Sequence, residues 1–364
     1  MRNAWLLLAF ISIVTGCASQ QQKAYNKLLQ SYPNENFITQ INTLIQKKQP
    51  RFFNGIILVA KDGDIIYTKA QGYANFETKK PLALDDRFRI MSNSKQITAV
   101  LVLKEAQEGN VDLHIPIKNY LPDLKESWAE TVTIHQLLNM SSGIIDLERP
   151  LLFEAGTGYR YSNPGYGLLG KIIERVSGVS YSENVSMLFK QLDMKNTYPY
   201  QLGHMDSELI DGYWLHNEGL ERVDFENSQF TADTWNLFLP AGGIISNAYD
   251  LLNWDQKLHS GQILEPSYYQ LLTTPTNKGP HAAFDGDTIG YAYGFRVHEQ
   301  HRTKHLGHGG RGFGFVSIKF FIPEKNISVV VFENIYSRDA HFMSGEVVYF
   351  FENEIRKIIV NSNL

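Results

Sequence analysis

The spacing of hydrophobic positions predicts a helix and then two strands near the start of the chain. Apolar residues recur at helical spacing between Asn36 and Lys48, where Phe37, Ile41, Leu44 and Ile45 share one face. A continuous apolar run from Gly55 to Ala60 predicts a buried strand. The pair Asp62-Gly63 is typical of a tight hairpin turn, so Ile65 to Ala70 is predicted to be the second strand.

The last part of the chain shows the reverse order, with strands followed by a helix. We expect a turn at Pro323 to Asn326 and a final helix from Ala340 to Ile359. Between the two ends, from Gln96 to about Ser260, helical spacing predominates, as in Ile97 to Glu108 and Gly165 to Val176. The predicted C-terminal strands are Ala292 to His298, His305 to Gly307, Gly314 to Phe321 and Ile327 to Phe332.

This order of elements predicts a mixed α/β fold of the α+β type. Strands from both ends would form one mostly antiparallel sheet flanked by helices, with a helical subdomain inserted at about residues 96–260. We expect one such domain over residues 33–362 and a binding site in the cleft between its two parts. The formal net charge of -4 over 364 residues gives no sign of a nucleic-acid surface.

The N-terminal residues predict a targeting signal rather than part of the fold. After the basic start at Arg2, the apolar run from Trp5 to Val14 is too short to span a bilayer. The sequence Val14-Thr15-Gly16-Cys17 resembles a bacterial lipoprotein signal. The resemblance implies a signal over residues 1–17, lipidation of Cys17 and a tether over residues 18–32. A plain secretory signal with a chance cysteine is the alternative.

The lipoprotein interpretation places the protein in the cell envelope. A lipid on Cys17 would anchor it to a membrane, and Ala18-Ser19 after the cysteine implies the periplasmic side of the outer membrane in a Gram-negative organism. Cys17 is the only cysteine, so the domain has no thiol for catalysis and no intramolecular disulfide.

Three short motifs carry the candidate chemistry. Ser92 and Lys95 are three residues apart at the start of a predicted helix, which places a hydroxyl beside an amine. Lysine acts as a base only when neutral, and lowering its pKa from about 10.4 to near 7 costs roughly 4–5 kcal/mol. Burial or nearby positive charge would supply that shift.

The second and third motifs supply proton transfer and substrate contacts. Tyr161 is a candidate to shuttle a proton, sharing one with Lys95, and Asn163 is a candidate to hold Lys95 and a substrate amide. His308-Gly309-Gly310 places small residues on a strand, where a substrate backbone can approach closely. The N–H groups of Arg311 and Ser92 would then form an oxyanion hole.

Together these motifs resemble the serine beta-lactamase and penicillin-binding-protein superfamily, in the branch that holds class C beta-lactamases, D-Ala-D-Ala carboxypeptidases and esterases. The resemblance implies an acyl-enzyme on Ser92, proton transfer by Lys95 and Tyr161, and substrate contacts by Asn163, His308, Gly310 and Arg311. The matching segments are Phe88 to Lys95, Leu137 to Gly143, Phe153 to Gly170, Pro240 to Ser246 and His308 to Phe315.

Two positions depart from the family pattern. His308 stands where true beta-lactamases have lysine, and neutral histidine is a weaker clamp for a carboxylate. Arg311 is a candidate to replace that charge. Asn139 stands where relatives often carry histidine, and we interpret it as structural.

A histidine ladder suggests a metal site but lacks the ligand geometry. Its members fall on predicted strands and a turn, which would scatter their side chains over both faces, and no acidic ligand accompanies them. No metal or organic cofactor is therefore predicted. His305-Leu306-Gly307 also fits the third motif, but the glycines after His308 continue the family pattern better. The ladder comprises His298, His301, His305 and His308.

The sequence predicts a serine hydrolase acting on a small acyl, peptide or peptidoglycan-like substrate. It does not separate a peptidase or beta-lactamase from an esterase. The alternative class is a non-catalytic, lipid-tethered peptide-binding protein of the same fold. The intact pair Ser92 and Lys95 argues against that alternative, because a binding module has no need of the lysine.

Overall fold

A computed structural model describes most of the chain beyond the predicted signal and tether. It covers residues 37–203, 206–228, 230–284, 286–300, 302–337 and 345–364. The predicted signal over 1–17, with Cys17, and the tether over 18–32 lie outside the described residues. Within the described part, no helix is both long and apolar enough to cross a bilayer.

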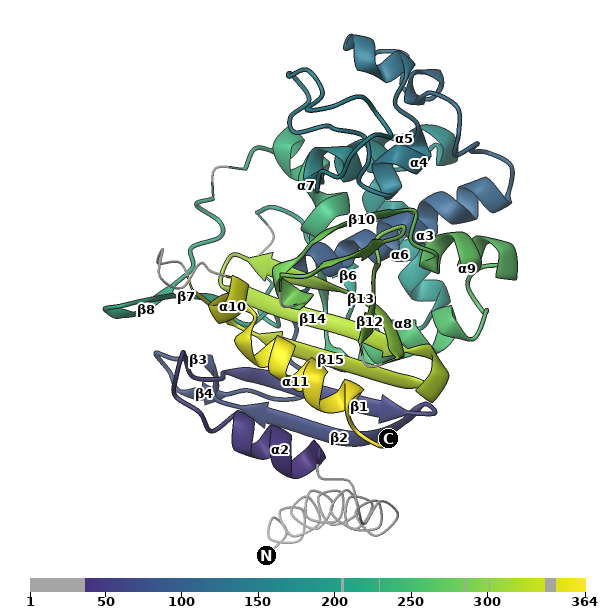
Figure 1. Cartoon of the computed structure of the whole chain (residues 1–364). Helices are drawn as coiled ribbons and strands as arrows, with labels where there is room; N and C mark the ends of the chain where they lie inside the picture. The colour runs from purple at the N-terminus through teal and green to yellow at the C-terminus, as the bar shows by residue number, and fades with distance from the viewer. Residues whose placement is uncertain (1–36, 204–205, 229, 285, 301, 338–344) are drawn as a thin grey trace, which may run out of the picture.

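An eight-stranded antiparallel sheet is built from both ends of the chain, as predicted (Figure 1). Its two N-terminal strands lie beside the C-terminal β15, which pairs with β1 from Gly55 opposite Glu333 to Lys61 opposite Ile327. The strands, in spatial order, are β10 (Asn277–Pro280), β11 (Thr288–Tyr291), β12 (Arg296–Gln300), β13 (Thr303–Gly312), β14 (Phe315–Ile322), β15 (Ile327–Glu333), β1 (Gly55–Lys61) and β2 (Asp64–Gln71).

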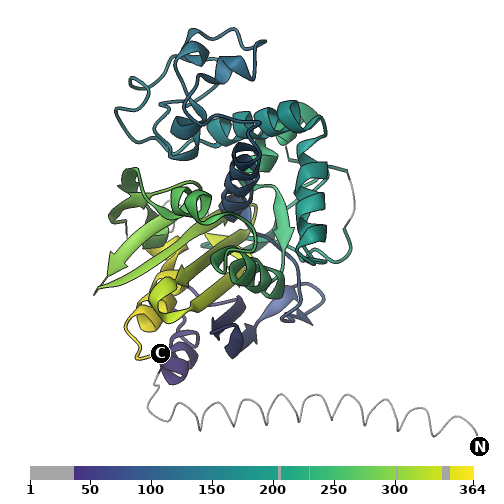
Figure 2. The same cartoon turned by 90° about the vertical axis from the view of Figure 1, so that its right-hand side faces the viewer.

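Helices cover both faces of this sheet. The two helices near the chain ends, α2 (Phe37–Leu44) and α11 (Phe350–Val360), lie on one face, and α8 (Ala248–His259) lies on the other (Figure 2). Because side chains alternate along a strand, Ile57 and Val59 of β1 pack toward α2 and α11, while Ile56 and Leu58 pack into the core on the other side. The predicted two-sided burial of β1 is therefore confirmed.

A helical part stands above one end of the sheet (Figure 1). At its centre, α3 is buried on nearly all sides, which fits an apolar helix enclosed by others. The start of α5 is fixed by Ser162, whose hydroxyl accepts a hydrogen bond from the Gly165 N–H at 3.0 Å. The helices are α3 (Ser94–Gln107), α4 (Ile134–Leu138), α5 (Asn163–Ser177), α6 (Tyr181–Gln191), α7 (Ala232–Gly242) and α9 (Pro266–Thr273).

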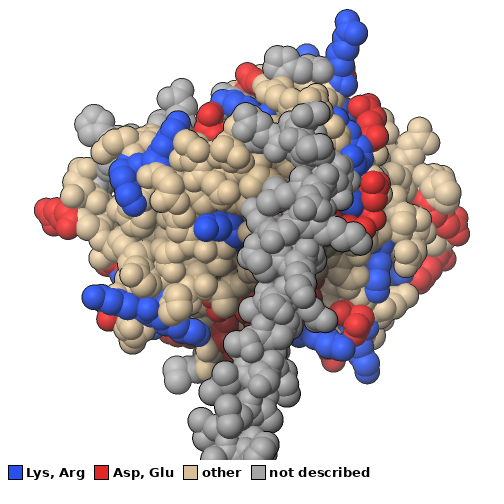
Figure 3. Space-filling model, turned by 90° about the horizontal axis from the view of Figure 1, so that it is seen from below, with Lys and Arg blue, Asp and Glu red and all other residues tan. Residues whose placement is uncertain are grey.

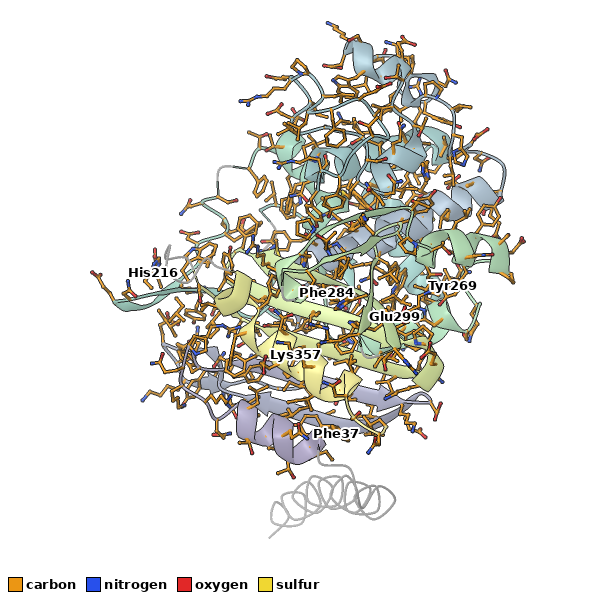
Figure 4. The ribbon with its side chains drawn as sticks, viewed as in Figure 1. Phe37, His216, Tyr269, Phe284, Glu299 and Lys357 are labelled. Atoms are coloured by element: carbon orange, nitrogen blue, oxygen red, sulfur yellow. The ribbon has the colours of Figure 1, made fainter. Side chains whose placement is uncertain are left out.

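Three small sheets contain short strands that the sequence pattern did not reveal. One small sheet has the order β5 (Phe88–Arg89), β9 (Ile244–Ser246), β6 (Tyr198–Pro199). Another has the order β16 (Ile335–Ser337), β7 (Tyr213–His216), β8 (Gly219–Arg222), and its β7–β8 hairpin, with His216, projects from the body (Figure 4). A third pairs β3 (Tyr73–Asn75) with β4 (Lys80–Pro81). The exact limits of the helical subdomain stay a prediction.

One predicted strand was wrong. The segment Ala292 to His298 is not continuous, because β11 ends before it and β12 begins inside it. Gly294 has φ +72°, a turn conformation that glycine adopts without steric cost. A Cβ at this position would lie 2.6 Å from the carbonyl oxygen of Lys95, so the turn packs directly against the start of α3.

The predicted final helix is also interrupted within the described residues. It appears as α10 (Gly345–Val348) and α11, with Tyr349 between them, while positions 340–344 lie outside the described part.

On the surface seen from below, acidic and basic side chains are interspersed, in keeping with the small net charge (Figure 3).

Candidate active site

Ser92 lies on a short, strained turn between β5 and α3. The turn is a 3₁₀ segment over Met91–Asn93, and Met91 has φ +51°, which costs a non-glycine residue about 1–3 kcal/mol. The Ser94 hydroxyl donates to the Met91 carbonyl at 2.6 Å and accepts from the Ile244 N–H at 3.2 Å. These bonds hold the turn so that Ser92 stays half-buried at the start of α3.

A buried polar network supports this turn from behind. The Asn93 amide donates to the Ser317 hydroxyl at 2.9 Å, and the Gln96 amide donates to Asn93 at 3.2 Å. Lys319 donates to Gln96 at 3.0 Å and forms an ion pair with Asp255 of α8. The network therefore ties the nucleophile turn to β14 and α8.

Lys95 is fully buried, and its amine makes three polar contacts. Nζ lies 2.8 Å from Asn163 Oδ1, 2.7 Å from the Ala241 carbonyl oxygen and 3.2 Å from Ser92 Oγ. Burial holds the pKa of Lys95 well below its usual value, and the positive charge of Arg296 lowers the pKa further. The neutral amine is therefore favoured.

The contact pattern of Lys95 suits a base. A neutral amine has two N–H groups and one lone pair, and the oxygens of Asn163 and Ala241 can only accept hydrogen bonds. The two N–H groups are thus used, and the lone pair is left for the proton of Ser92 Oγ. This places a proton acceptor beside a hydroxyl, which is the arrangement of an activated nucleophile.

Tyr161 lies against Lys95, but no hydrogen bond joins the two side chains. Lys95 Nζ is 4.7 Å from the centre of the Tyr161 ring, and the buried Tyr161 hydroxyl makes no well-formed hydrogen bond with the described residues. Burial raises the pKa of Tyr161 above its usual value, and the nearby Ser92 lowers it by a smaller amount. The phenol is therefore protonated, since burial outweighs the effect of its neighbours.

A cavity of about 400 Å³ opens beside Ser92. Ser92, Tyr161, Asn163 and Arg311, four of the predicted site residues, share its wall, although they come from three distant segments of the chain. None of the residues that line the cavity is acidic, and two are arginines. The remaining lining residues are Pro280, His281, Ala282, Arg296, Gly309 and Tyr349.

Arg296 is a site residue that sequence reasoning missed. It is 1% exposed, and its Nη2 donates to the Tyr159 hydroxyl at 3.1 Å. Its Nε and Nη1 atoms are buried without a hydrogen-bond partner among the described residues. The guanidinium lies 5.5 Å from the ring centre of Tyr161 and 5.1 Å from that of Tyr291. A buried cation without a carboxylate is costly, so its place in the cavity wall indicates a use.

Comparison with known proteins decides the family. Residues 41–346 match the family described as Beta-lactamase. The chain belongs to the beta-lactamase family. Protein flp of Staphylococcus aureus strain MW2 is 26% identical over 330 residues, and the match covers 82% of this chain but only 63% of that relative. The chain thus spans less than two thirds of the length of this relative.

Two solved structures show the same fold. The octameric penicillin-binding protein homologue from Pyrococcus abyssi is 28% identical, with a TM-score of 0.70 over 86% of this chain and 76% of that one. The D-amino acid amidase from Ochrobactrum anthropi SV3 is 22% identical, with a TM-score of 0.74 over 90% of this chain and 99% of that one. The predicted beta-lactamase fold is therefore confirmed.

Two predicted substrate contacts of the third beta-lactamase-type motif lie away from the cavity wall. His308 is fully buried; its Nδ1 lies 2.6 Å from the Gly309 carbonyl oxygen and its Nε2 lies 3.3 Å from the Tyr291 hydroxyl. Because a carbonyl only accepts, we assign the proton to Nδ1. Burial holds the pKa of His308 well below its usual value, with Arg296 and Lys95 lowering it further, so His308 cannot clamp an anion as a cation.

Gly310 packs closely against the turn that carries Ser92. A Cβ at this position would lie 2.4 Å from the Ile90 carbonyl oxygen and 3.0 Å from Met91 Cβ. Only glycine therefore lets β13 approach the turn that carries Ser92. Gly309 and Arg311, on either side, line the cavity instead.

The histidine ladder does not form a metal centre in the described residues. His298 lies opposite His305 in the β12–β13 pairing, with ring centres 5.1 Å apart, whereas His308 packs near Tyr161. His301 lies outside the described part. Nowhere in that part do three or more His, Cys, Asp or Glu side chains form a group that could hold a metal ion.

Asn139 is buried in a local hydrogen-bond network. Its Oδ1 accepts from both the N–H and the hydroxyl of Ser141, and its Nδ2 donates to Thr276 at 3.1 Å. These bonds fix the loop after α4, which is consistent with a structural role at this position.

Proposed function

We propose that the protein is a serine hydrolase of the beta-lactamase family that forms an acyl-enzyme on Ser92. The observation that carries this proposal is the state of Lys95. Its pKa is held well below the usual value, two carbonyl oxygens occupy its N–H groups, and its lone pair is left for Ser92 Oγ at 3.2 Å.

The proposed reaction has two steps. Ser92 Oγ attacks the carbonyl carbon of an ester or amide, and Lys95 Nζ takes the hydroxyl proton. The N–H groups of Ser92 and Arg311 stabilise the negative oxygen of the tetrahedral intermediate. The protonated Tyr161 hydroxyl passes a proton to the leaving group, and Lys95 returns one to Tyr161. The bond from the carbonyl carbon to the leaving group breaks, which leaves the acyl group on Ser92 Oγ. Water then attacks the acyl carbon and gives a proton to Lys95. The bond from that carbon to Ser92 Oγ breaks, and Lys95 returns the proton to Ser92.

We infer that substrates carry a negatively charged group. The cavity contains Arg311 at its exposed side, the buried Arg296, and no acidic lining residue. The Nε and Nη1 donors of Arg296 have no hydrogen-bond partner among the described residues, so the guanidinium can bind a carboxylate. The sequence left the choice of carboxylate-binding residue between His308 and Arg311. We propose Arg296 for this role, assisted by Arg311.

One edge of β13 is open beside the cavity and suits an extended substrate. β12 pairs with β13 only as far as Arg296 opposite Gly307. Among the described strands, the stretch from His308 to Gly312 is therefore paired on the β14 side only. An extended peptide could add to this edge. A small amide, peptide or peptidoglycan-like compound is thus favoured, in line with the D-amino acid amides implied by the name of the amidase with the same fold.

The proposal includes the location of the protein in the cell. The lipoprotein-like sequence ending at Cys17 supports a lipid-anchored protein of the cell envelope, on the periplasmic side of the outer membrane in a Gram-negative organism. Replacement of Cys17 by serine should then move the protein from the membrane fraction to the soluble fraction; retention in the membrane fraction would contradict the anchor.

Covalent labelling tests the proposed chemistry. The purified protein would be treated with a fluorophosphonate and, separately, with a penicillin, and its intact mass measured. We expect one adduct in the wild type, none in Ser92→Ala, and an unchanged adduct in the control Ser186→Ala, which alters an exposed serine of α6. Penicillin labelling favours a peptidoglycan-type substrate, and fluorophosphonate labelling alone favours an esterase.

Absence of any adduct in the wild type would favour the alternative, a lipid-tethered peptide-binding protein of the same fold. The buried Lys95 argues against this alternative. Burying a lysine without a carboxylate partner costs free energy, and a protein that only binds peptides does not need it.

A further inference from the structure

Arg296 faces a set of groups that can change charge, and none of them is acidic. The groups come from α3, the loop before α5, the segment after β10, and strands β11 and β13, and each has its pKa affected by Arg296. They are Lys95, Tyr159, Tyr161, His281, Tyr291 and His308. The positive charge of Arg296 is therefore not compensated by any group in contact with it.

Arg296 and Lys95 are placed against the same aromatic ring. Lys95 Nζ lies 4.7 Å and the Arg296 guanidinium 5.5 Å from the centre of the Tyr161 ring. The other titratable groups around Lys95 are Tyr161, Tyr166, His281 and His308, and burial favours the neutral form of each. Arg296 is thus the positive charge that acts on Lys95 through a water-poor environment.

We propose that Arg296 couples the charge of the substrate to the proton-accepting state of Lys95. The proposal rests on the proposed function and adds a property to it. A substrate carboxylate that pairs with the Arg296 guanidinium neutralises the charge that repels a proton on Lys95. A neutral substrate in the same cavity leaves that repulsion in place.

The sign of the effect follows from the two forms of Lys95. Burial and Arg296 both lower the pKa of Lys95, and only burial remains effective once an anion is bound. The pKa of Lys95 therefore rises in the complex with an anionic substrate. When the pH is lowered, Lys95 in this complex becomes protonated, and stops acting as a base, at a higher pH than in the free enzyme. For two charges about 10 Å apart in a protein, the expected rise is about one pH unit. By reciprocity, protonation of Lys95 strengthens binding of the anion.

A matched pair of substrates tests this coupling in the wild-type protein. The two esters are the phenylacetyl ester of 3-hydroxybenzoic acid and the same compound as its methyl ester. Rapid-mixing experiments across pH would give the limiting acylation rate constant, which reports the complex, and the second-order rate constant, which reports the free enzyme. For the carboxylate ester, the acidic midpoint of the limiting rate should lie about one pH unit above that of the second-order constant. For the methyl ester, the two midpoints should coincide.

Variants assign the effect to Arg296. In Arg296→Gln the midpoints should coincide for both esters, and Arg296→Lys, which keeps the charge, should retain a difference. The control Arg160→Gln removes an exposed arginine next to Tyr161 in the sequence and should leave the wild-type difference unchanged.

The outcomes separate this proposal from the one on which it rests. The coupling would be overturned if, in the wild type, the midpoints of the two rate constants differed by the same amount for both esters. It would also be overturned if the difference for the carboxylate ester persisted in Arg296→Gln. In either case Ser92-dependent hydrolysis would remain. Hydrolysis that is equally fast in Ser92→Ala would instead overturn the proposed function. If Arg296→Gln fails to fold, the wild-type comparison still decides.

Discussion

Two pairs of buried basic side chains in this protein have opposite surroundings. In the sheet core, Arg51 makes a bidentate contact with Glu333 at 2.6 and 2.8 Å and lies 3.4 Å from Glu352. Lys319 is paired with Asp255. Beside Ser92, Lys95 and Arg296 are just as buried, but no carboxylate contacts either of them in the described residues.

The difference separates charges that hold the fold from charges that serve the reaction. A buried ion pair recovers part of its desolvation cost through its partner, so Arg51 and Lys319 fix the positions of strands and helices. A buried basic group without a carboxylate recovers less of its desolvation cost in the free protein. Lys95 and Arg296 therefore lower stability in exchange for a neutral base and an anion site, as is common at active sites.

The largest expected effect comes from removing the unpaired lysine. Lys95→Met should lower the acylation rate of Ser92 by about 10²- to 10⁴-fold, because the proton of Ser92 then has no acceptor. The rate of fluorophosphonate labelling measures this directly. Lys104→Met, on the same helix but near its other end, should label at the wild-type rate. A Lys95→Met protein that labels as fast as the wild type would remove the lysine from the mechanism.

Breaking the paired arginine should affect stability instead. Arg51→Met should lower the free energy of unfolding by about 3–5 kcal/mol, because Glu333 is left buried and uncompensated. Urea unfolding would measure the loss. The double variant Arg51→Met/Glu333→Gln should recover part of it, since the second change removes the stranded charge; no recovery would mean that the arginine stabilises mainly by packing.

The smallest effect has the opposite sign. Arg296→Met should raise the free energy of unfolding by about 1 kcal/mol, because it removes a buried charge that has no carboxylate. Among the described residues, the hydrogen bond lost is the one to the Tyr159 hydroxyl. The same urea experiment checks it, and a loss of stability comparable to that of Arg51→Met would show that the two arginines have equivalent roles.

The sequence predicted the parts that depend on local spacing. The two-sided burial of β1 and the hairpin at Asp62-Gly63 follow from neighbouring residues, and so does the approach of Lys95 to Ser92 on one helical turn. The contact between Lys95 and Asn163 joins segments 68 residues apart. It was predicted from the residue types of the second motif and not from local spacing.

The walls of the cavity depend on long-range pairing, which spacing does not encode. Arg296 was hidden in a predicted continuous strand, although Gly294 two residues earlier was a signal for a turn. Tyr349 reaches the cavity from the break between α10 and α11, and His281 from the segment after β10. The burial of His308 behind Tyr161 likewise follows from how β13 packs, not from its motif.

The pairing of the two chain ends has a consequence for how this protein is made. Arg51 and Glu333 are 282 residues apart, so during synthesis the edge of β1 that faces β15 stays open until almost the entire chain has emerged. The central sheet therefore forms late, and folding is slow compared with that of a protein built from local contacts. A chain that stops before Ile327 exposes the apolar edge of β1 and is expected to aggregate rather than to form a smaller stable unit.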